Sequence, residues 1–425
     1  MSDKGDKKNT AIEEQAEASC STKRNVELVS PAGTLEKLKI AIVYGADAVY
    51  LSGKKYGLRK HAGNFTMEEL KAGVAFAHER NRRVYVGVNI FARNRDLHGL
   101  ASYVEALADA SIDGVIVADP GVLALVKGYL SNVRVHVSTQ ANVTNWRAAE
   151  FWRDLGADRI ILSRELTQEE VAEIASRTSA EIEVFVHGAM CVAYSGRCLL
   201  SAYLTGRSAN LGECAQPCRW SYTLLPNGEE EKPLTIEEDG AGTYLLSSAD
   251  LCMVSHLKKL IEAGVAAMKI EGRMRSIYYV ANATRVYRKA LEAYHDGSTV
   301  DSMQREWQNE LAHLTRRGYT RGFYLGDGAR ETQEDEHHST CRNQRFLGLI
   351  LEDESDGLMK IRAFNKIEIG QTMEIMSFLR KNDRLCTVCE ILDKNGERIK
   401  KTGAGEVVHI GTDTKGQPNE ILRAI

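Results

Sequence analysis

The residue pattern between positions 26 and 271 constrains the fold more than any other feature of the chain. Short runs rich in Val, Ile and Leu alternate there with longer stretches in which apolar residues recur at helical spacing. The predicted strands occupy residues 26–30, 47–52, 83–90, 113–118, 133–138, 158–163, 181–188 and 266–271. Eight strands separated by helices predict an α/β fold of the (β/α)8, TIM-like barrel type. A doubly wound open sheet is the alternative, but no G-x-G-x-x-G motif follows the first strand.

Polar side chains stand at the carboxyl end of nearly every predicted strand. In (β/α)8 barrels the chemistry collects at this end, because all eight strands deliver their last residues to one rim. A single polar strand end is often merely solvated, so the prediction of a site rests on the whole set. The set comprises Ser30, Ser52, Asn89, Asp119, Ser138, Gln140, Ser163, Arg164, Glu165, His187, Glu271 and Arg273.

The eighth predicted strand ends in Lys269, Glu271 and Arg273, which alternation places on one face, toward the barrel mouth. Two cations beside a carboxylate suit an anionic organic substrate, and arginine can clamp a carboxylate with two hydrogen bonds. An internal ion pair that only closes the barrel would use the same residues. Arg59, after the second strand, is expected to reach the same rim.

The segment between the seventh and eighth strands contains a group of cysteines. Four of them are spaced seven, sixteen and four residues apart, with glycines between them: Cys191, Cys198, Cys214 and Cys218. Thiolates separated by glycine turns can converge on a metal, and this irregular all-cysteine spacing fits an iron–sulfur cluster at least as well as zinc. Buried, inert cysteines are the alternative. Cys252, expected in the first turn of a later helix, is a fifth candidate, so the fourth ligand is either Cys218 or Cys252.

Composition shifts divide the chain into parts. We expect residues 1–24 to form a disordered tail and residues 25–327 to form the barrel, with an insertion at 188–264. Residues 328–340 are expected to be a charged linker. Residues 341–425 predict a small β-barrel, because short strands alternate there with Asp-Gly, Asn-Gly and Lys-Gly turns. Within it, Cys386 and Cys389 lie three residues apart, which on a strand directs their thiols to opposite faces and favours a structural role.

The composition is that of a soluble globular protein, with 43% hydrophobic and 27% charged residues. No run approaches the ~18 apolar residues of a membrane helix, and the first residues lack a signal-peptide core, so a cytoplasmic protein without a membrane partner is expected. The net charge of −3 argues against a general nucleic-acid coat but allows a local basic patch.

Several of these segments resemble one known family. The pattern Glu183-x-Phe185-x2-Gly188-Ala189-Met190-Cys191-x4-Gly196-x-Cys198-x-Leu200-Ser201 is similar to the signature of the collagenase-like peptidase family, family U-32. The segments LVSPAG (28–33), Arg59 to Phe65, CAQPCRW (214–220), KIEGR (269–273) and TRRGYTRGFYLG (315–326) resemble it as well. The resemblance covers most of the chain.

The family was named for proteolysis, but several of its members are oxygen-independent hydroxylases of RNA or of quinone precursors that hold a 4Fe–4S cluster on four cysteines. In size the chain most resembles the tRNA branch. That resemblance implies formation of 5-hydroxyuridine at the wobble position, with prephenate as the oxygen donor. Cys252 instead resembles the ligand arrangement of the quinone branch. The implied partners are tRNA, a small anionic co-substrate, and an electron-transfer or iron–sulfur delivery protein.

Three function classes therefore follow: an RNA hydroxylase, a peptidase, and a non-catalytic iron–sulfur scaffold or redox sensor. The residues favour the hydroxylase, because the chain has no G-x-S-x-G or H-E-x-x-H motif and no recognisable Cys–His pair. The candidate catalytic residues are Lys269, Glu271, Arg273 and His187. The candidate substrate-binding residues are Arg59, Asn64, Asn89, Gln140 and Arg164, and the candidate cluster ligands are Cys191, Cys198, Cys214, Cys218 and Cys252.

Overall fold

The computed structural model describes residues 26–58, 63–191, 193–220, 238–239, 242–243, 249–297, 301–314, 318–326, 346–353, 357–378 and 382–425. The predicted tail at 1–24 and the predicted linker at 328–340 lie outside these residues, as does Arg59. None of the helices in the described parts is long and apolar enough to cross a membrane.

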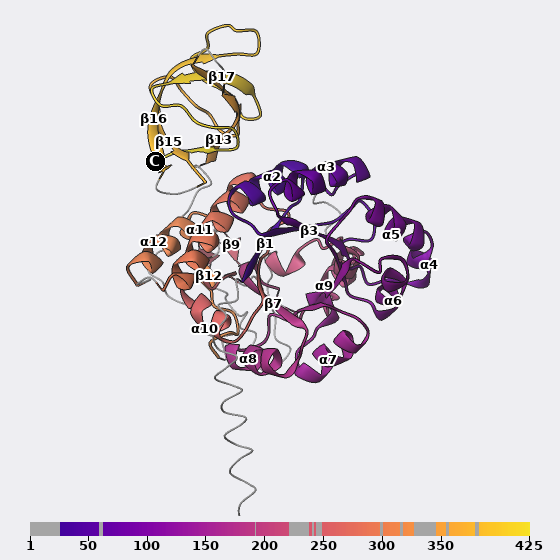
Figure 1. Cartoon of the computed structure of the whole chain (residues 1–425). Helices are drawn as coiled ribbons and strands as arrows, with labels where there is room; N and C mark the ends of the chain where they lie inside the picture. Colours follow the sequence, from indigo (N-terminus) through magenta and orange to yellow (C-terminus); the bar gives the residue numbers. More distant parts are fainter. Residues whose placement is uncertain are drawn as a thin grey trace, which may run out of the picture.

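Eight parallel strands close into a barrel (Figure 1). In chain order they are β1 (Glu27–Pro31), β2 (Ala48–Leu51), β3 (Arg83–Val88), β4 (Gly114–Val117), β5 (Arg134–Val137), β6 (Arg159–Ile161), β7 (Glu181–Ala189) and β11 (Ala267–Ile270). The last strand, β11, pairs with both β1 and β7 and so closes the ring. The predicted (β/α)8 barrel is thus confirmed and the open-sheet alternative is wrong.

Helices surround the barrel, and their first turns show why they begin where they do. The threonines before α3 and α8 form capping boxes, Thr66 with Glu69 and Thr167 with Glu170, so that two backbone N–H groups are satisfied at each start. The helices between strands are α2 (Leu35–Val43), α3 (Met67–His78), α4 (Asn94–Leu97), α5 (Leu100–Asp109), α6 (Pro120–Tyr129), α7 (Trp146–Asp154), α8 (Gln168–Arg177) and α10 (Leu257–Glu262).

The long helix α11 (Ile277–His295) follows the last barrel strand and is buried along most of its length. A helix that is covered on nearly all sides must have protein on both faces. One side packs on β1 and α2, and the other meets α12 (Asp301–Ala312) and the C-terminal domain. Helix α11 is therefore the structural bridge between the two barrels.

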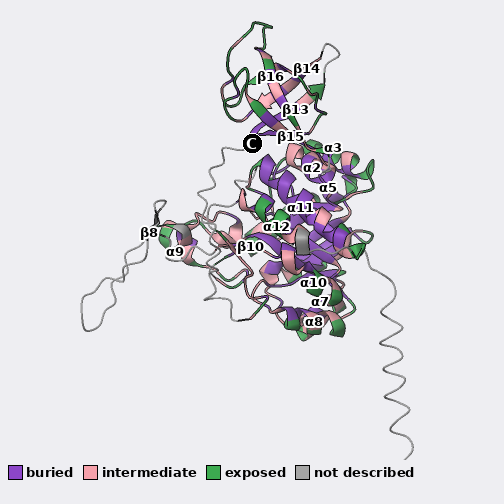
Figure 2. Ribbon diagram, turned by 90° about the vertical axis from the view of Figure 1, so that its left-hand side faces the viewer, coloured by how far each residue is buried: buried purple, intermediate pink, exposed green. Residues whose placement is uncertain are grey.

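Part of the segment between β7 and β11, including the region of α9, projects from one end of the barrel (Figure 2). It contains α9 (Leu200–Thr205), the 3-10 turns η2 (Ala209–Leu211) and η3 (Pro217–Arg219), and an antiparallel pair of short strands, β8 (Glu238–Asp239) and β9 (Gly242–Thr243). The fold-class prediction of a cysteine-rich insertion between the seventh and eighth barrel strands is confirmed.

The segment returns through β10 (Asp250–Cys252), which pairs antiparallel with the end of β7 and parallel with β12 (Tyr319–Thr320). The expectation that Cys252 begins a helix is therefore wrong. Its backbone is in a strand because the extended end of β7 offers a free edge, with Cys252 opposite His187. The helix α10 begins only at Leu257, after the 3-10 turn η4 (Val254–His256).

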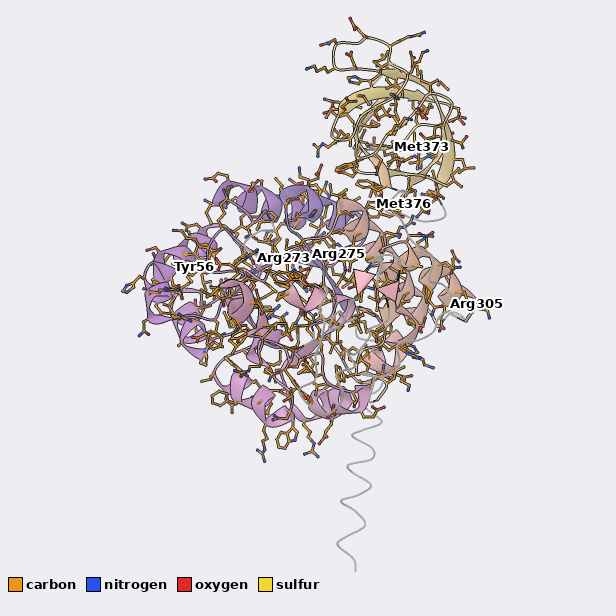
Figure 3. All side chains as sticks on the ribbon, turned by 180° about the vertical axis from the view of Figure 1, so that it is seen from behind. Tyr56, Arg273, Arg275, Arg305, Met373 and Met376 are labelled. Carbon is orange, nitrogen blue, oxygen red and sulfur yellow. The ribbon has the colours of Figure 1, made fainter. Side chains whose placement is uncertain are left out.

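The C-terminal domain is a closed antiparallel barrel, as predicted. Its strands are β13 (Phe346–Asp353), β14 (Leu358–Ala363), β15 (Thr372–Met376), β16 (Arg384–Leu392), β17 (Val407–Thr412) and β18 (Ile421–Arg423). On β16, Cys386 is buried whereas Cys389 is exposed, so the two thiols point to opposite faces. Met373 lies inside this barrel, and Met376 lies at the end facing the larger one (Figure 3).

The two barrels meet through buried polar contacts as well as apolar ones. Arg285 of α11 donates to the Asp383 carboxylate at 2.8 Å, and Arg423 of β18 donates to Glu310 of α12 at 2.8 Å. The Tyr44 hydroxyl donates to the carbonyl of Met376 at 2.9 Å. Moving the two barrels apart would leave these buried charges without their partners. The contacts therefore favour one fixed arrangement of the domains.

Candidate active site at the mouth of the barrel

A network of ion pairs fills the lower part of the barrel interior. Arg159 bridges Glu27 at 2.5 Å and Glu183 at 3.1 Å, and Glu183 also accepts a hydrogen bond from Lys269 at 2.8 Å. Burial alone would raise the pKa of Glu27, but the charge of Arg159 and its hydrogen bonds hold that pKa below its ordinary value. We call Glu27, Arg159, Glu183 and Lys269 the floor network.

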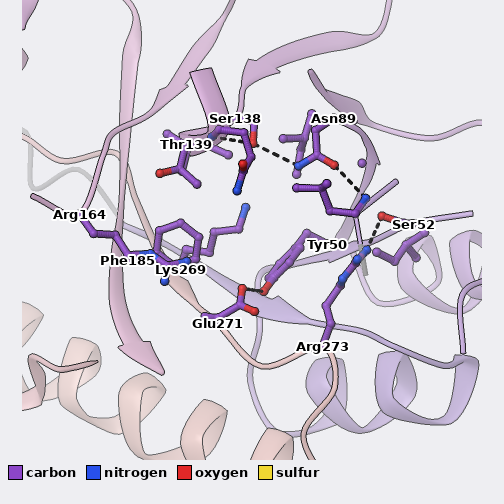
Figure 4. Close-up of a pocket in the computed structure, with 16 residues that line it drawn as sticks. Tyr50, Ser52, Asn89, Ser138, Thr139, Arg164, Phe185, Lys269, Glu271 and Arg273 are labelled. Atoms are coloured by element: carbon purple, nitrogen blue, oxygen red, sulfur yellow. Dashed lines mark hydrogen bonds between the residues drawn. The ribbon is translucent and has the colours of Figure 1, made fainter. Parts of the chain in front are cut away.

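Above the floor network lies the mouth cavity, with an empty volume of about 570 Å³ (Figure 4). Its wall combines cations, a carboxylate, hydroxyls and amides, all near the carboxyl ends of the strands, as expected for this fold. The lining residues are Tyr50, Leu51, Ser52, Leu58, Gly87, Asn89, Ile116, Ser138, Thr139, Gln140, Ile161, Arg164, Phe185, Lys269, Glu271 and Arg273.

Hydrogen bonds across the wall hold these side chains in place. The Arg273 guanidinium donates to the Ser52 hydroxyl, and the Asn89 amide donates to the Ser138 hydroxyl at 3.1 Å. Gly87 leaves room for this arrangement, since a Cβ there would lie 2.8 Å from the Ser52 hydroxyl. The wall is therefore built from side chains already oriented before any ligand arrives.

Positive charge gathers at the mouth cavity. The Arg164 guanidinium carbon lies 3.8 Å from the centre of the Phe185 ring, and the Lys269 ammonium lies 4.2 Å from the centre of the Tyr50 ring. Burial lowers the pKa of Lys269, against the opposing effect of Glu183. Lys269 thus belongs to the ion pair and lines the cavity at the same time, so the two interpretations of its role are not exclusive.

Tyr50 and Glu271 form a pair in the wall. The Tyr50 hydroxyl donates to Glu271 Oε2 at 2.9 Å, and burial together with the negative charge of Glu271 raises the pKa of Tyr50 well above its ordinary value. The phenol therefore stays protonated and acts as a donor at neutral pH. The carboxylate it orients is the one anionic group among the side chains that line the mouth cavity.

A second cavity, with an empty volume of about 770 Å³, adjoins the first. The two share Leu58, Thr139, Gln140 and Arg164 in their walls. Three of the predicted ligands, Cys191, Cys198 and Cys214, line this cysteine cavity. The tertiary structure therefore brings these three thiols to one space, directly beside the polar mouth.

Two further observations bear on the chemistry of the thiols. Desolvation by the surrounding protein, and then the charges of Cys198 and Cys214, raise the pKa of Cys191, although the Cys191 side chain is exposed to the cavity. The backbone N–H of Gln216 donates to the Cys214 sulfur at 3.3 Å. Soft thiolate donors that share a cavity and receive backbone hydrogen bonds fit an iron–sulfur cluster.

The thiols line the cavity wall without meeting at its centre. Among the described residues, no group of three or more His, Cys, Asp or Glu side chains is close enough to hold a metal ion. The glycines of this segment have backbones that allow tight turns: Gly196 and Gly212 both have positive φ angles. A Cβ at Gly196 would lie 2.3 Å from the Gln140 carbonyl, so this glycine is required where the segment crosses the mouth.

The two candidates for a fourth ligand lie in different surroundings. Cys218 sits in η3, which packs against α9 in the same inserted segment as the other three. Cys252 lies behind β7, where its sulfur is 3.9 Å from the Tyr287 hydroxyl, and burial raises its pKa to about 11. Neither lines the cysteine cavity. Packing therefore places Cys218 near the loop of the three thiols and Cys252 beside an aromatic side chain behind β7.

His187, a candidate catalytic residue at the strand-end rim, does not line the mouth cavity. Strict alternation would aim Glu183, Phe185 and His187 inward, but the pairing of β7 with β11 shifts between Lys269 and Ile270. This β-bulge turns His187 outward, where its ring packs against Tyr279, Tyr287 and Tyr319. It is almost fully buried and its pKa is lowered to about 3, chiefly by burial, so it stays neutral.

The other predicted residues divide as follows. Lys269, Glu271, Arg273, Asn89, Gln140 and Arg164 all line the mouth cavity. Asn64 is buried and belongs to the lining of neither cavity, and Arg59 lies outside the described residues. Tyr50 was not predicted. The sequence could have indicated Tyr50, because it lies two residues before Ser52 and residues two apart on a strand share a face.

Two family models match most of the chain, and several known proteins are similar to it. The model of peptidase family U32 matches residues 33–334, and the model of the peptidase family U32 C-terminal domain matches residues 342–423. A protein of Bacillus subtilis called tRNA hydroxylation protein P1 is 40% identical over 400 residues, covering 93% of this chain and 94% of the relative. The tRNA hydroxylation protein P of Escherichia coli is 36% identical over 392 residues, covering 83% and 86%.

A collagenase of Porphyromonas gingivalis is also similar, with 33% identity over 334 residues that cover 76% of this chain and 79% of the relative. The two family models together span most of both barrels. On this evidence the chain belongs to peptidase family U32.

Proposed function

We propose that the protein is an oxygen-independent, iron–sulfur-dependent RNA hydroxylase. Its proposed substrate is the wobble uridine of tRNA, converted to 5-hydroxyuridine with prephenate as the oxygen donor. Relatives named as tRNA hydroxylation proteins align with it over nearly their whole length. The observation that carries the proposal is the shared wall between a cationic mouth cavity and a cavity lined by three thiols.

The cysteine cavity is the proposed cluster site. Cys191, Cys198 and Cys214 would hold three irons of a 4Fe–4S cluster, with Cys218 as the fourth ligand because its turn η3 packs against α9, close to the loop that carries the other three. Binding requires this glycine-containing segment to close around the cluster. When bound, the cluster would supply one-electron redox chemistry next to the mouth.

The mouth cavity is the proposed site of the anionic donor. Prephenate carries two carboxylates, and Arg164, Arg273 and Lys269 present cations to this space. Arg273 is oriented by Ser52, which fixes its fork before the ligand binds. Glu271, oriented by the hydroxyl of Tyr50, is the group that would accept a proton at the mouth.

The shared residues Gln140 and Arg164 lie between the two spaces. Gln140 can donate and accept hydrogen bonds, which suits the edge of a uracil ring. The stacked Arg164 would separate the anion from the thiols while facing both. The two reactants of a hydroxyl transfer would thus meet at this boundary.

The collagenase relative supports a peptidase as the competing function. A peptidase needs an activated nucleophile or a metal-held water. Within the described structure, His187 faces tyrosines behind β7, and neither ring nitrogen of His136 has a hydrogen-bond partner. Neither histidine is thus placed to activate a nucleophile at the mouth, so the hydroxylase is the better-supported proposal.

The first test measures modified nucleosides in tRNA. A strain lacking this gene should lose 5-hydroxyuridine and its derivatives by mass spectrometry, and the wild-type gene should restore them. The Cys191→Ala gene should not restore them, whereas Cys389→Ala, an exposed thiol of the small barrel, should. Unchanged hydroxyuridine in the deletion strain would refute the tRNA substrate and favour a scaffold, a sensor or a peptidase.

The second test measures iron and acid-labile sulfide in protein purified without oxygen. About four irons per chain are expected in the wild type. Cys191→Ala and Cys218→Ala should lose iron, whereas Cys252→Ala should keep it. Retention by Cys218→Ala together with loss by Cys252→Ala would assign the fourth ligand to Cys252. A protein free of iron would refute the cluster-dependent mechanism.

A further inference from the structure

Exposed aromatic side chains gather around the cysteine cavity. Tyr194 lines that cavity and is 63% exposed, and Tyr203 on α9 is 87% exposed. Phe91, after β3, is 57% exposed, and its backbone N–H donates to the carbonyl of Asn210, another residue of the cavity wall. Large aromatic side chains exposed to this extent are costly on a surface that has no partner.

The segment that carries these aromatics is held to the cysteine loop. The Ser201 hydroxyl of α9 donates to the Arg207 carbonyl at 2.7 Å and accepts from the backbone N–H of Ala215 at 3.0 Å. Ala215 follows the cavity residue Cys214. Tyr203 is therefore presented at a defined position beside the cavity.

The charge of this surface is positive. Its acidic side chains, in residues 91–98 and 193–218, are Asp96 and Glu213. Asp96 accepts from the backbone N–H of Arg93, which uses part of its charge locally. The exposed basic side chains of the same two segments are Arg93, Arg95, Arg197 and Arg207.

We propose that Phe91, Tyr194 and Tyr203 form a stacking platform for unpaired nucleobases of the RNA substrate. This inference rests on the proposed function and specifies how its substrate is held. Planar aromatic rings interleaved with arginines match a single strand, whose bases stack on rings while its phosphates meet cations. The neighbouring bases of a loop would stack on the platform while the target uridine enters the cavity.

The test measures binding of the full-length protein, purified without oxygen, to a fluorescein-labelled anticodon stem–loop RNA with uridine at the wobble position. Tyr203→Ala and Tyr194→Ala should each raise the Kd about tenfold through lost stacking, whereas Tyr203→Phe should bind like the wild type. Arg197→Ala should lower the slope of log Kd against log salt concentration by about 0.7.

Tyr129→Ala is the matched control. Tyr129 is 49% exposed at the C-terminal end of α6, and helices of such barrels run opposite to the strands, so it lies at the end remote from the mouth. This variant should bind RNA normally. Equal affinity of the wild type, Tyr203→Ala and Tyr194→Ala would overturn the platform.

A second readout separates this proposal from the proposed function. If Tyr203→Ala keeps full RNA affinity but loses iron in cells, the surface binds an iron–sulfur delivery protein and the platform is refuted. Hydroxyuridine in tRNA is scored independently. If the wild-type protein forms no hydroxyuridine but the Tyr203→Ala variant binds RNA more weakly than the wild type, the proposed function fails while the RNA platform stands.

Discussion

The two ends of the barrel interior both carry charged side chains, but they use them differently. At the floor, the charges have close partners: Arg159 lies 2.5 Å from Glu27 and 3.1 Å from Glu183. At the mouth, Arg273 and Arg164 line an empty volume of about 570 Å³, and Arg273 is oriented by a neutral hydroxyl.

The difference separates structural charges from charges available to a ligand. A buried ion pair compensates its own desolvation and leaves little field for a third partner. A cation held by a neutral acceptor, as Arg164 is held by the Ala189 carbonyl, keeps its charge for an incoming anion. Lys269 stands at the junction, since it pairs with Glu183 below and lines the cavity above.

The largest effect is expected at the floor. Glu183→Ala leaves Arg159 and Lys269 buried without their shared carboxylate, which should cost about 3–5 kcal/mol of unfolding free energy. Denaturant unfolding of purified protein measures it. Glu352→Ala removes an exposed ion pair with Lys360 and should cost less than about 1 kcal/mol. A loss at Glu183 as small as that control would show that the floor network is dispensable.

At the mouth the expected loss is in activity and not in stability. Arg273→Ala should lower kcat/KM for the proposed anionic co-substrate about 100-fold, roughly 3 kcal/mol of transition-state binding, with RNA affinity unchanged. Arg275→Ala is the control, because Arg275 pairs with Asp250 and is not among the residues that line either cavity. Equal effects of the two variants would mean that Arg273 serves only the fold.

Beside the floor network, His136 predicts an acid sensitivity. It is fully buried, and burial and then the cations around it lower its pKa well below its ordinary value. The groups facing it are Arg159, Arg134, Lys269, Arg83 and the Tyr85 ring. The folded protein therefore keeps this histidine neutral where the unfolded chain protonates it.

Because the folded pKa is the lower one, stability is complete above about pH 6.5 and falls as the pH falls below that value. Each proton bound only by the unfolded chain lowers the free energy of unfolding by about 1.4 kcal/mol per pH unit. Unfolding free energies measured across this range should decline less steeply in His136→Phe. Parallel pH profiles of the two proteins would contradict the assignment.

The smallest expected effect concerns the orientation of Glu271. Tyr50→Phe removes the hydroxyl that donates to this carboxylate and should lower kcat about fivefold, roughly 1 kcal/mol. Tyr56→Phe, which removes a hydroxyl bonded to the His98 carbonyl outside the mouth, is the control. If the Tyr50→Phe enzyme is as active as this control, the orientation of Glu271 by Tyr50 does not contribute to the reaction.

Local patterns were enough to locate much of the site. The alternation in the last barrel strand correctly brought Lys269, Glu271 and Arg273 to one cavity, and the ends of other strands supplied Asn89, Gln140 and Arg164. Spacing and glycines grouped the cysteines of the inserted segment, three of which line one space. These features are encoded within a few residues of each other.

Long-range pairing accounts for what local patterns missed. His187 turns outward because β7 and β11, about eighty residues apart, pair with a bulge. Cys252 is in a strand because the free edge of β7 recruits it, not because of its own neighbours. The partners of Arg159 in the floor network come from β1 and β7, so no local motif announces them.

The sequence by itself determined the number and order of the barrel strands, the small second barrel and the candidate thiols, because periodicity and turn residues act over short distances. Only the tertiary structure decided which charges are neutralised in pairs and which face open space. It also decided which thiols share a cavity. Those outcomes depend on which strands become neighbours and on the register in which they pair.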